Sequence, residues 1–152
     1  MGCKYTYQMK HSRTFFLLLS LLAFSGCEKV PPLSERIAKS WTARVVTWNS
    51  TTVYTRGGTS NTTPGYTNYS LQLTTAGNVN LREFTGETFT GKWALEGETT
   101  LKITDLSPAP TGTNGQMTFT IDGITDSELR LSATQAYAKT GDQRVAYTLQ
   151  IQ

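Results

Sequence analysis

The sequence predicts an all-β domain, an antiparallel up-and-down β-barrel of about eight strands behind one short helix. Beyond Trp41 the chain is a series of short segments with alternating apolar and polar residues, separated by Gly, Asn, Asp and Pro. Thr fills 25 positions between residues 28 and 152, and this β-branched polar residue suits the solvent face of a strand. Short connections indicate a meander, and closure into a barrel leaves no unpaired sheet edge. An open β-sandwich would give a similar pattern and is the alternative.

The elements follow from local patterns. Residues 33–40, LSERIAKS, space Leu33 and Ile37 by one helical turn, with Ser34 as the expected N-cap. The predicted strands are 41–48, 53–56, 66–74, 79–84, 87–95, 99–105, 116–122, 128–133 and 144–152. The loop at 57–65, GGTSNTTPG, holds turn-forming residues and no apolar anchor, so we expect it to be mobile.

The alternation also predicts which side chains face inward, and we expect no charged residue in phase with them in the strong strands. These inward positions are Tyr69, Leu71, Leu73, Phe89, Gly91, Trp93, Leu95, Leu101, Ile103, Met117, Phe119, Ile121, Leu129, Leu131, Val145, Tyr147, Leu149 and Ile151. Such a lining leaves two alternatives. Either side chains fill the interior, or a dry cavity accepts an apolar molecule.

The N-terminal segment reads as an export signal. Lys10, His11 and Arg13 precede an apolar run of about ten residues, which as a helix covers about 15 Å and is too short to span a bilayer. The stretch LAFSGC at 22–27 resembles a bacterial lipoprotein signal, although Phe24 stands where Leu, Val or Ile is usual. That resemblance implies a signal peptide at 1–26, lipidation of Cys27, a tether at 27–33 and a folded domain at 34–152. It places the protein in the bacterial cell envelope, on the outer membrane facing the periplasm, with the cell surface as the alternative.

Composition restricts the chemistry of the mature chain. Without residues 1–26 it holds 11 basic and 11 acidic residues, so it has no electrostatic footprint for nucleic acid. The single His lies in the leader, and no Cys follows Cys27. Ser-His and Cys-His catalysis and His- or Cys-based metal sites therefore lack their residues, and no glycine-rich phosphate-binding motif occurs. We expect no enzyme activity, no metal and no cofactor.

Carboxylates are the remaining catalytic groups. The nearest pairs are Glu83/Glu87 and Glu96/Glu98, and a hydrolase would place such a pair across a cleft. Glu96 and Glu98 instead flank a hairpin glycine, where acidic residues solubilise a turn. The segment 122–128 lacks the ligand spacing of a calcium loop, and we interpret it as a turn.

Aromatic residues provide the candidate binding site. Trp48 is out of phase with Trp41, and with Tyr54, Tyr66 and Tyr69 it borders the long polar loop. An aromatic cluster at a barrel mouth could stack on a sugar or a lipid headgroup. The alternative is ordinary packing between strands.

The arrangement of motifs resembles the lipocalin-like lipoproteins of Bacteroidetes. The resemblance rests on Trp41 at the start of the first strand, FTGKWALEGETTLKIT at 89–104, ITDSELRLSA at 124–133 and the closing YTLQI at 147–151. Lys39 stands where true lipocalins have glycine, and the arginine that packs over the tryptophan would be Arg130 or Arg144. The resemblance implies a lipocalin-like barrel that binds a small apolar ligand. The alternative is an interaction module with a filled core, such as an envelope-complex subunit, an inhibitor or a glycan-binding accessory.

Overall fold

A computed structural model describes residues 30–152, and residues 31–152 form one compact unit within it. The predicted signal peptide at 1–26 and the predicted lipidation site Cys27 lie outside the described residues. Within those residues the model contains a short helix, nine strands and two 3-10 helices. Their bounds are α2 Leu33–Ile37, β1 Ser40–Trp48, β2 Thr51–Thr55, η2 Pro64–Asn68, β3 Ser70–Leu73, β4 Asn78–Arg82, β5 Thr88–Glu96, β6 Thr100–Ser107, β7 Met117–Ile124, β8 Glu128–Ala133, η3 Ala138–Thr140 and β9 Val145–Ile151.

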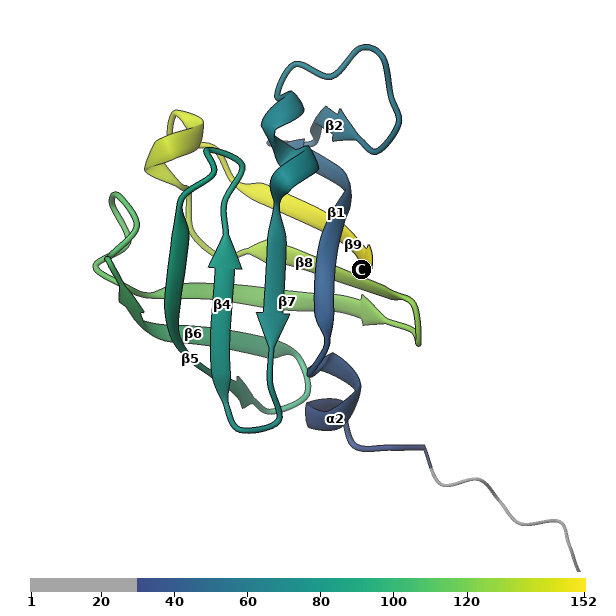
Figure 1. The fold of residues 1–152 in the computed structure, drawn as a ribbon, viewed down its shortest axis with the longest axis vertical. Helices are drawn as coiled ribbons and strands as arrows, with labels where there is room; N and C mark the ends of the chain where they lie inside the picture. The colour runs from purple at the N-terminus through teal and green to yellow at the C-terminus, as the bar shows by residue number, and fades with distance from the viewer. Residues whose placement is uncertain (1–29) are drawn as a thin grey trace, which may run out of the picture. The chain divides into compact units, whose positions relative to one another are not determined.

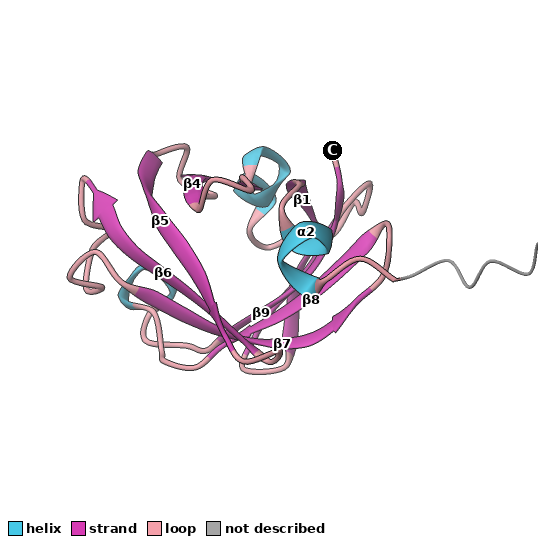
Figure 2. Cartoon of the chain, turned by 90° about the horizontal axis from the view of Figure 1, so that it is seen from below, coloured by secondary structure: helices cyan, strands magenta, loops and turns pink. Residues whose placement is uncertain are grey.

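The strands close into a barrel. All pairs are antiparallel, and each strand from β3 to β8 pairs with the next one in the chain. Strand β1 pairs with β9 over Trp41–Trp48, which closes a ring of eight strands (Figures 1 and 2). The barrel prediction is therefore confirmed, and the sandwich alternative is wrong.

The meander is interrupted once. The same edge of β1 pairs with β3 at Ser40–Thr42 and with β2 at Val45–Trp48. Strand β2 is thus an extra ribbon on the ring, and the chain must cross back from β2 to reach β3. It does so through residues 56–69, above one end of the barrel (Figure 1).

That crossing corrects the bounds of one predicted strand and shows how the polar loop before it is held. The strand expected over 66–74 starts only at Ser70, because residues 64–68 form η2 with Pro64 at its first turn. The loop at 57–65 has a polar anchor, since the Asn61 side chain accepts from the Thr55 N–H at 2.8 Å. Asn61 also donates to the carbonyls of Thr55 and Gly58, at 3.0 and 3.1 Å.

Helix α2 covers the other end of the barrel (Figure 2). It begins after Pro32 without a side-chain cap, so the expected Ser34 cap is wrong. The fully buried Ile37 accepts a 2.9 Å hydrogen bond from Trp41 Nε1. Lys39 Nζ lies 5.9 Å from the Trp41 ring centroid, and it also donates to the Asp126 carbonyl at 2.9 Å. The cation over Trp41 is thus Lys39, whereas Arg130 lies exposed on β8 beside Glu128.

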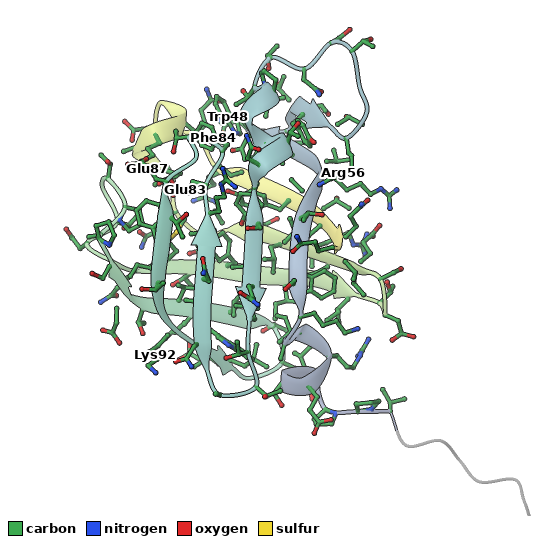
Figure 3. All side chains as sticks on the ribbon, in the orientation of Figure 1. Trp48, Arg56, Glu83, Phe84, Glu87 and Lys92 are labelled. Atoms are coloured by element: carbon green, nitrogen blue, oxygen red, sulfur yellow. The ribbon has the colours of Figure 1, made fainter. Side chains whose placement is uncertain are left out.

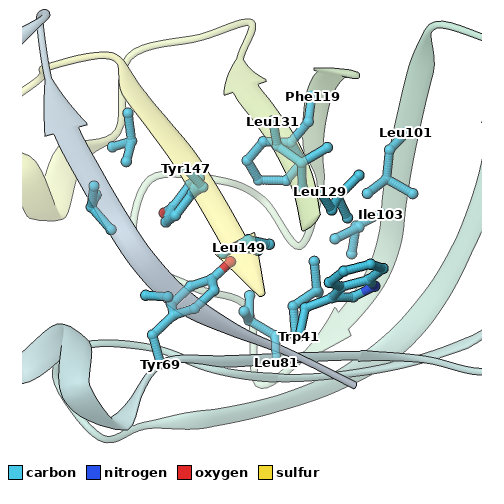
Figure 4. Packing of buried hydrophobic residues seen from close by; sticks show 14 of the residues in the cluster. Trp41, Tyr69, Leu81, Leu101, Ile103, Phe119, Leu129, Leu131, Tyr147 and Leu149 are labelled. Atoms are coloured by element: carbon cyan, nitrogen blue, oxygen red, sulfur yellow. The ribbon is translucent and has the colours of Figure 1, made fainter. Parts of the chain in front are cut away.

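The core confirms most of the inward-facing set. Leu101, Leu129, Leu131 and Leu149 are fully buried, and they pack with Trp41, Ile103, Phe119 and Tyr147 inside the ring (Figure 4). Gly91, Leu95, Met117 and Ile121 of the inward set are only partly buried, and Ile151 is 40% exposed near the free end of β9.

Candidate functional site

The barrel end opposite α2 is closed by aromatic rings. Trp48 Nε1 donates to the Tyr66 hydroxyl at 3.0 Å, and the two rings meet edge to face at 6.4 Å. Tyr66 also contacts Tyr54 at 6.0 Å, Tyr69 at 6.1 Å and Phe84 at 4.7 Å between ring centroids. Tyr69 stacks on Tyr147 at 4.9 Å, further into the barrel (Figure 4). We call this set of Trp48, Tyr54, Tyr66, Tyr69, Phe84 and Tyr147 the aromatic plug.

Irregular backbone places two members of the plug. In β1 the register with β9 shifts between Ala43 and Val45, so the inward phase moves from Trp41 and Ala43 to Val46. After this bulge Trp48 is in phase with Val46, two residues before it, and faces the plug. Without the bulge, its odd spacing from Trp41 would place it on the opposite face. Tyr66 reaches the interior because η2 carries it there.

The structure therefore brings together all four predicted mouth residues. Tyr54, Tyr66 and Tyr69 are at most 3% exposed, and Trp48 is partly buried. Their faces pack on one another, so they form a stopper rather than an open platform for stacking on a ligand. Figure 3 shows Trp48 and Phe84 side by side at this end of the molecule.

A buried carboxylate lies beside the plug. Glu83 is 2% exposed, and it accepts a short hydrogen bond from the Tyr137 hydroxyl. The positive charge beside Glu83 is Lys139 of η3, whose Nζ lies 2.6 Å from Glu83 and 2.5 Å from Glu87. Lys139 is itself only 12% exposed, and its Nζ lies 5.0 Å from the Phe89 ring centroid. We call Glu83, Glu87, Tyr137 and Lys139 the latch.

The latch joins segments that are far apart in the sequence. Glu83 and Glu87 belong to the turn between β4 and β5, whereas Tyr137 and Lys139 belong to the connection from β8 to β9. Lys139 lies between the two carboxylates, in the space that a hydrolytic water would need. The arrangement fastens one loop to another across the end of the barrel.

The electrostatics of the latch follow from this geometry. Burial acts to lower the pKa of Lys139, but hydrogen bonds and charge from Glu83 and Glu87 outweigh it, and the pKa is raised. The Lys139 hydrogen bond lowers the pKa of Glu87, assisted by Thr85. Lys139 is therefore held in its charged form.

The interior leaves little room for a ligand. Each of the 24 buried apolar side chains of the core is at most 8% exposed, and a void sized for an acyl chain would expose the side chains around it. Next to Phe119 and Tyr137, between the 112–118 and 133–137 segments, lies a small cavity of about 40 Å³. Drug-sized ligands occupy about 300–1,000 Å³, so this cavity suits water rather than an acyl chain.

The tyrosines of this end make the fold sensitive to alkali. Desolvation raises the pKa of Tyr66 to about 12 and also raises the pKa values of Tyr69, Tyr137 and Tyr147 above the ordinary value for tyrosine. A raised folded-state pKa gives stability that is present below the unfolded value of 10.0 and lost as the pH rises through the folded value.

We therefore expect the free energy of unfolding to fall from about pH 10 upward, by up to about 1.4 kcal/mol per pH unit for each buried tyrosine. Denaturant titrations at stepped pH, with phenolate absorbance followed in parallel, measure this. Tyr66→Phe should reduce the slope. Native-state ionisation of every tyrosine near pH 10 would contradict it.

The outer surface of the barrel contains a groove. It has a volume of about 500 Å³ and follows the outer face of β3 to β6, toward the α2 end. Six of its ten lining residues carry a carboxamide or a hydroxyl, namely Gln72, Thr74, Asn78, Asn80, Thr90 and Ser107. Val79, Gly91, Lys92 and Asp105 complete the lining, and carbon atoms make up most of its exposed surface. Figure 3 shows Lys92 far from Glu83 and Glu87.

Sequence reasoning missed the latch. Glu83 follows Val79 and Leu81 at the alternating spacing, so the alternation there extends to a buried carboxylate, in a segment for which no inward set was predicted. Nothing in the local sequence marked Tyr137 or Lys139. Within residues 30–152 no group of three or more His, Cys, Asp or Glu side chains could hold a metal ion. Nor does any helix there have the length and apolarity to cross a bilayer.

No protein-family model and no curated protein matches the chain. Among solved structures, a lipocalin-like protein from Bacteroides uniformis is 17% identical with a TM-score of 0.49, over 77% of this chain and 99% of that chain. An uncharacterised protein from Bacteroides eggerthii is 16% identical with a TM-score of 0.45, over 76% of this chain and 98% of that chain. Similarity at this level assigns no function.

Proposed function

We propose that the mature protein is a non-catalytic binding module of the bacterial cell envelope, attached through Cys27, that contacts its ligand or partner with its outer surface. The observation that supports this most is the filled interior, in which the core side chains are at most 8% exposed. The aromatic plug and the latch close the end that a carrier would leave open. This favours the interaction module over the carrier of a small apolar ligand.

The carrier is the second candidate, and one feature favours it. The cavity of about 40 Å³ is lined by Tyr137 of the latch and by Phe119, whose ring meets that of the plug residue Tyr147 at 6.1 Å. Opening the latch would enlarge it. Binding an acyl chain would then require breaking the contacts of Lys139 with Glu83 and Glu87, whose cost would weaken the affinity.

A titration with a fluorescent fatty acid separates the two candidates. We expect no saturable binding by the mature protein, because the interior lacks the volume. The double variant Tyr69→Ala/Tyr147→Ala removes two stacked rings and should bind the probe more tightly than the native protein. One-to-one binding by the native protein, or a lipid that survives purification in stoichiometric amount, would establish the carrier instead.

Attachment to the membrane is tested separately. We expect Cys27→Ser to abolish incorporation of an alkyne-labelled fatty acid in a Bacteroidetes host and to move the protein from the membrane fraction to the soluble fraction. The physical reason is that two acyl chains give stable anchoring, whereas the rest of the mature chain is polar and near neutral. Cys3→Ser is the matched control, since Cys3 lies in the predicted leader. Unchanged labelling of Cys27→Ser would exclude this anchor.

A further inference from the structure

The outer groove is built from aligned rows of polar side chains. Gln72 on β3 pairs with Asn80 on β4, Asn80 pairs with Thr90 on β5, and Thr90 pairs with Ser107 on β6. A shorter parallel row joins Asn78, Lys92 and Thr104. Neighbouring strands are about 4.8 Å apart, so the first row extends about 14 Å across the sheet. Gln72, Asn80, Thr90 and Ser107 are all exposed, so their side-chain donors and acceptors face solvent.

The residue types at these positions go against local structural preference. Thr occupies many outward positions elsewhere in the barrel, such as Thr120 and Thr148, as expected for a strand surface. Strand β4 instead places Asn78 and Asn80 outward, although Asn is depleted in strands. Places where a sequence departs from its own structural pattern are often functional sites. The carboxamides of β3 and β4 form such a place.

A bulge shapes one wall of the groove. Thr90 pairs with Ser107 and Lys92 with Thr104, so Gly91 alone lies opposite Asp105 and Leu106. Asp105 has a φ of +55°, which turns its side chain out while Leu106 stays buried. A side chain at Gly91 would collide with the β6 backbone, with an added Cβ 2.5 Å from the Thr104 carbonyl oxygen. The groove therefore depends on glycine at this position.

The charge of the groove restricts its ligand. Lys92 and Asp105 supply one charge of each sign, and Lys92 Nζ donates to the neutral Asn78 Oδ1 at 2.5 Å. Each carboxamide offers two donors and an acceptor, and each hydroxyl offers both functions. A ligand that matches this lining is neutral and carries many hydroxyl groups at short repeats. The volume of about 500 Å³ lies within the range of small-molecule sites.

We propose that the outer groove over β3 to β6 binds a neutral glycan chain, laid across the strands along the Gln72–Asn80–Thr90–Ser107 row. This rests on the proposed function, since it names the ligand class of the outer surface. The groove contains no aromatic ring to stack on a sugar, so hydrogen bonds supply the specificity and affinity is in the millimolar to high micromolar range.

Nuclear magnetic resonance titration of the mature protein tests the proposal. The probes are neutral hexasaccharides of glucose, mannose, galactose and N-acetylglucosamine, each added to millimolar concentration. For at least one of them we expect saturable shifts in the side-chain amide signals of Gln72, Asn78 and Asn80. Gln72→Thr with Asn80→Thr should weaken binding at least tenfold while keeping the strand pattern. Gln150→Thr makes the same chemical change on β9, outside the groove, and should leave binding unchanged.

Three results would overturn the proposal. They are no saturable shift with any hexasaccharide, shifts confined to residues outside the groove, and equal binding by the double variant and Gln150→Thr. None of these results would support the carrier of a small apolar ligand, because the fatty acid titration tests the barrel interior independently. Conversely, acyl binding inside the barrel would end the proposed function, and the amide signals would still report on the groove.

Discussion

Replacement of Trp41 by alanine should lower the free energy of unfolding by about 4 kcal/mol, a large share of the about 5–15 kcal/mol typical of a single domain. Trp41 is fully buried, and its indole N–H donates to the Ile37 carbonyl. Truncation leaves a void between α2 and the ring of strands and removes one of two donors to that carbonyl, the other being the Lys39 N–H at 2.8 Å. Equilibrium denaturant unfolding, followed by circular dichroism, measures the loss.

Trp48 provides the matched control. It is the same residue type on the same strand, but it is partly exposed and lies at the opposite end of β1. Trp48→Ala should therefore cost about half as much or less, because less apolar area leaves water during folding. Equal losses for the two variants would show that α2 and Trp41 do not support the closed end as described.

Replacement of Lys139 by methionine should destabilise the barrel by about 3 kcal/mol at neutral pH, because it leaves the Glu83 carboxylate buried without its cation. The methionine keeps the apolar stem of the side chain, so the loss reports on charge more than on packing. Denaturant unfolding of both proteins at neutral pH measures this loss.

Two further variants isolate the buried pair. Glu87→Gln removes the exposed partner of Lys139 and should cost much less than Lys139→Met. Glu83→Gln combined with Lys139→Met removes both buried charges. The double variant should therefore lose less free energy of unfolding than the sum of the losses of the two single variants. A Lys139→Met variant as stable as Glu87→Gln would mean that the latch does not hold the loops together.

Sequence periodicity was sufficient for the closed antiparallel barrel and for most of its core. The β8 face of Leu129 and Leu131 and the β9 face of Val145, Tyr147 and Leu149 are buried as the alternation predicts. Periodicity fails at bulges, because one extra residue moves the next apolar side chain to the other face. This is why Trp48 looked out of phase with Trp41 and why Leu106 was left out of the predicted strand.

The candidate sites show a different limit. Trp48, Tyr54, Tyr66 and Tyr69 were grouped correctly because they flank one loop, but sequence could not show that they bury one another. The latch pairs Glu83 with a lysine 56 positions later, and no local pattern encodes such a distance. The outer rows depend on register across four strands, which only the assembled sheet defines.

The closure of the ring through β1 has a consequence for the order of events during synthesis. The first strand to be made finds its principal partner in the last one, since Trp41 pairs with Ile151. Contacts of such large sequence separation form slowly, because the entropy of closing a long loop must be overcome before they give any stabilisation. The nascent chain therefore cannot complete its barrel until its C-terminus is available. A delay of that kind suits a protein whose leader predicts passage across a membrane before folding.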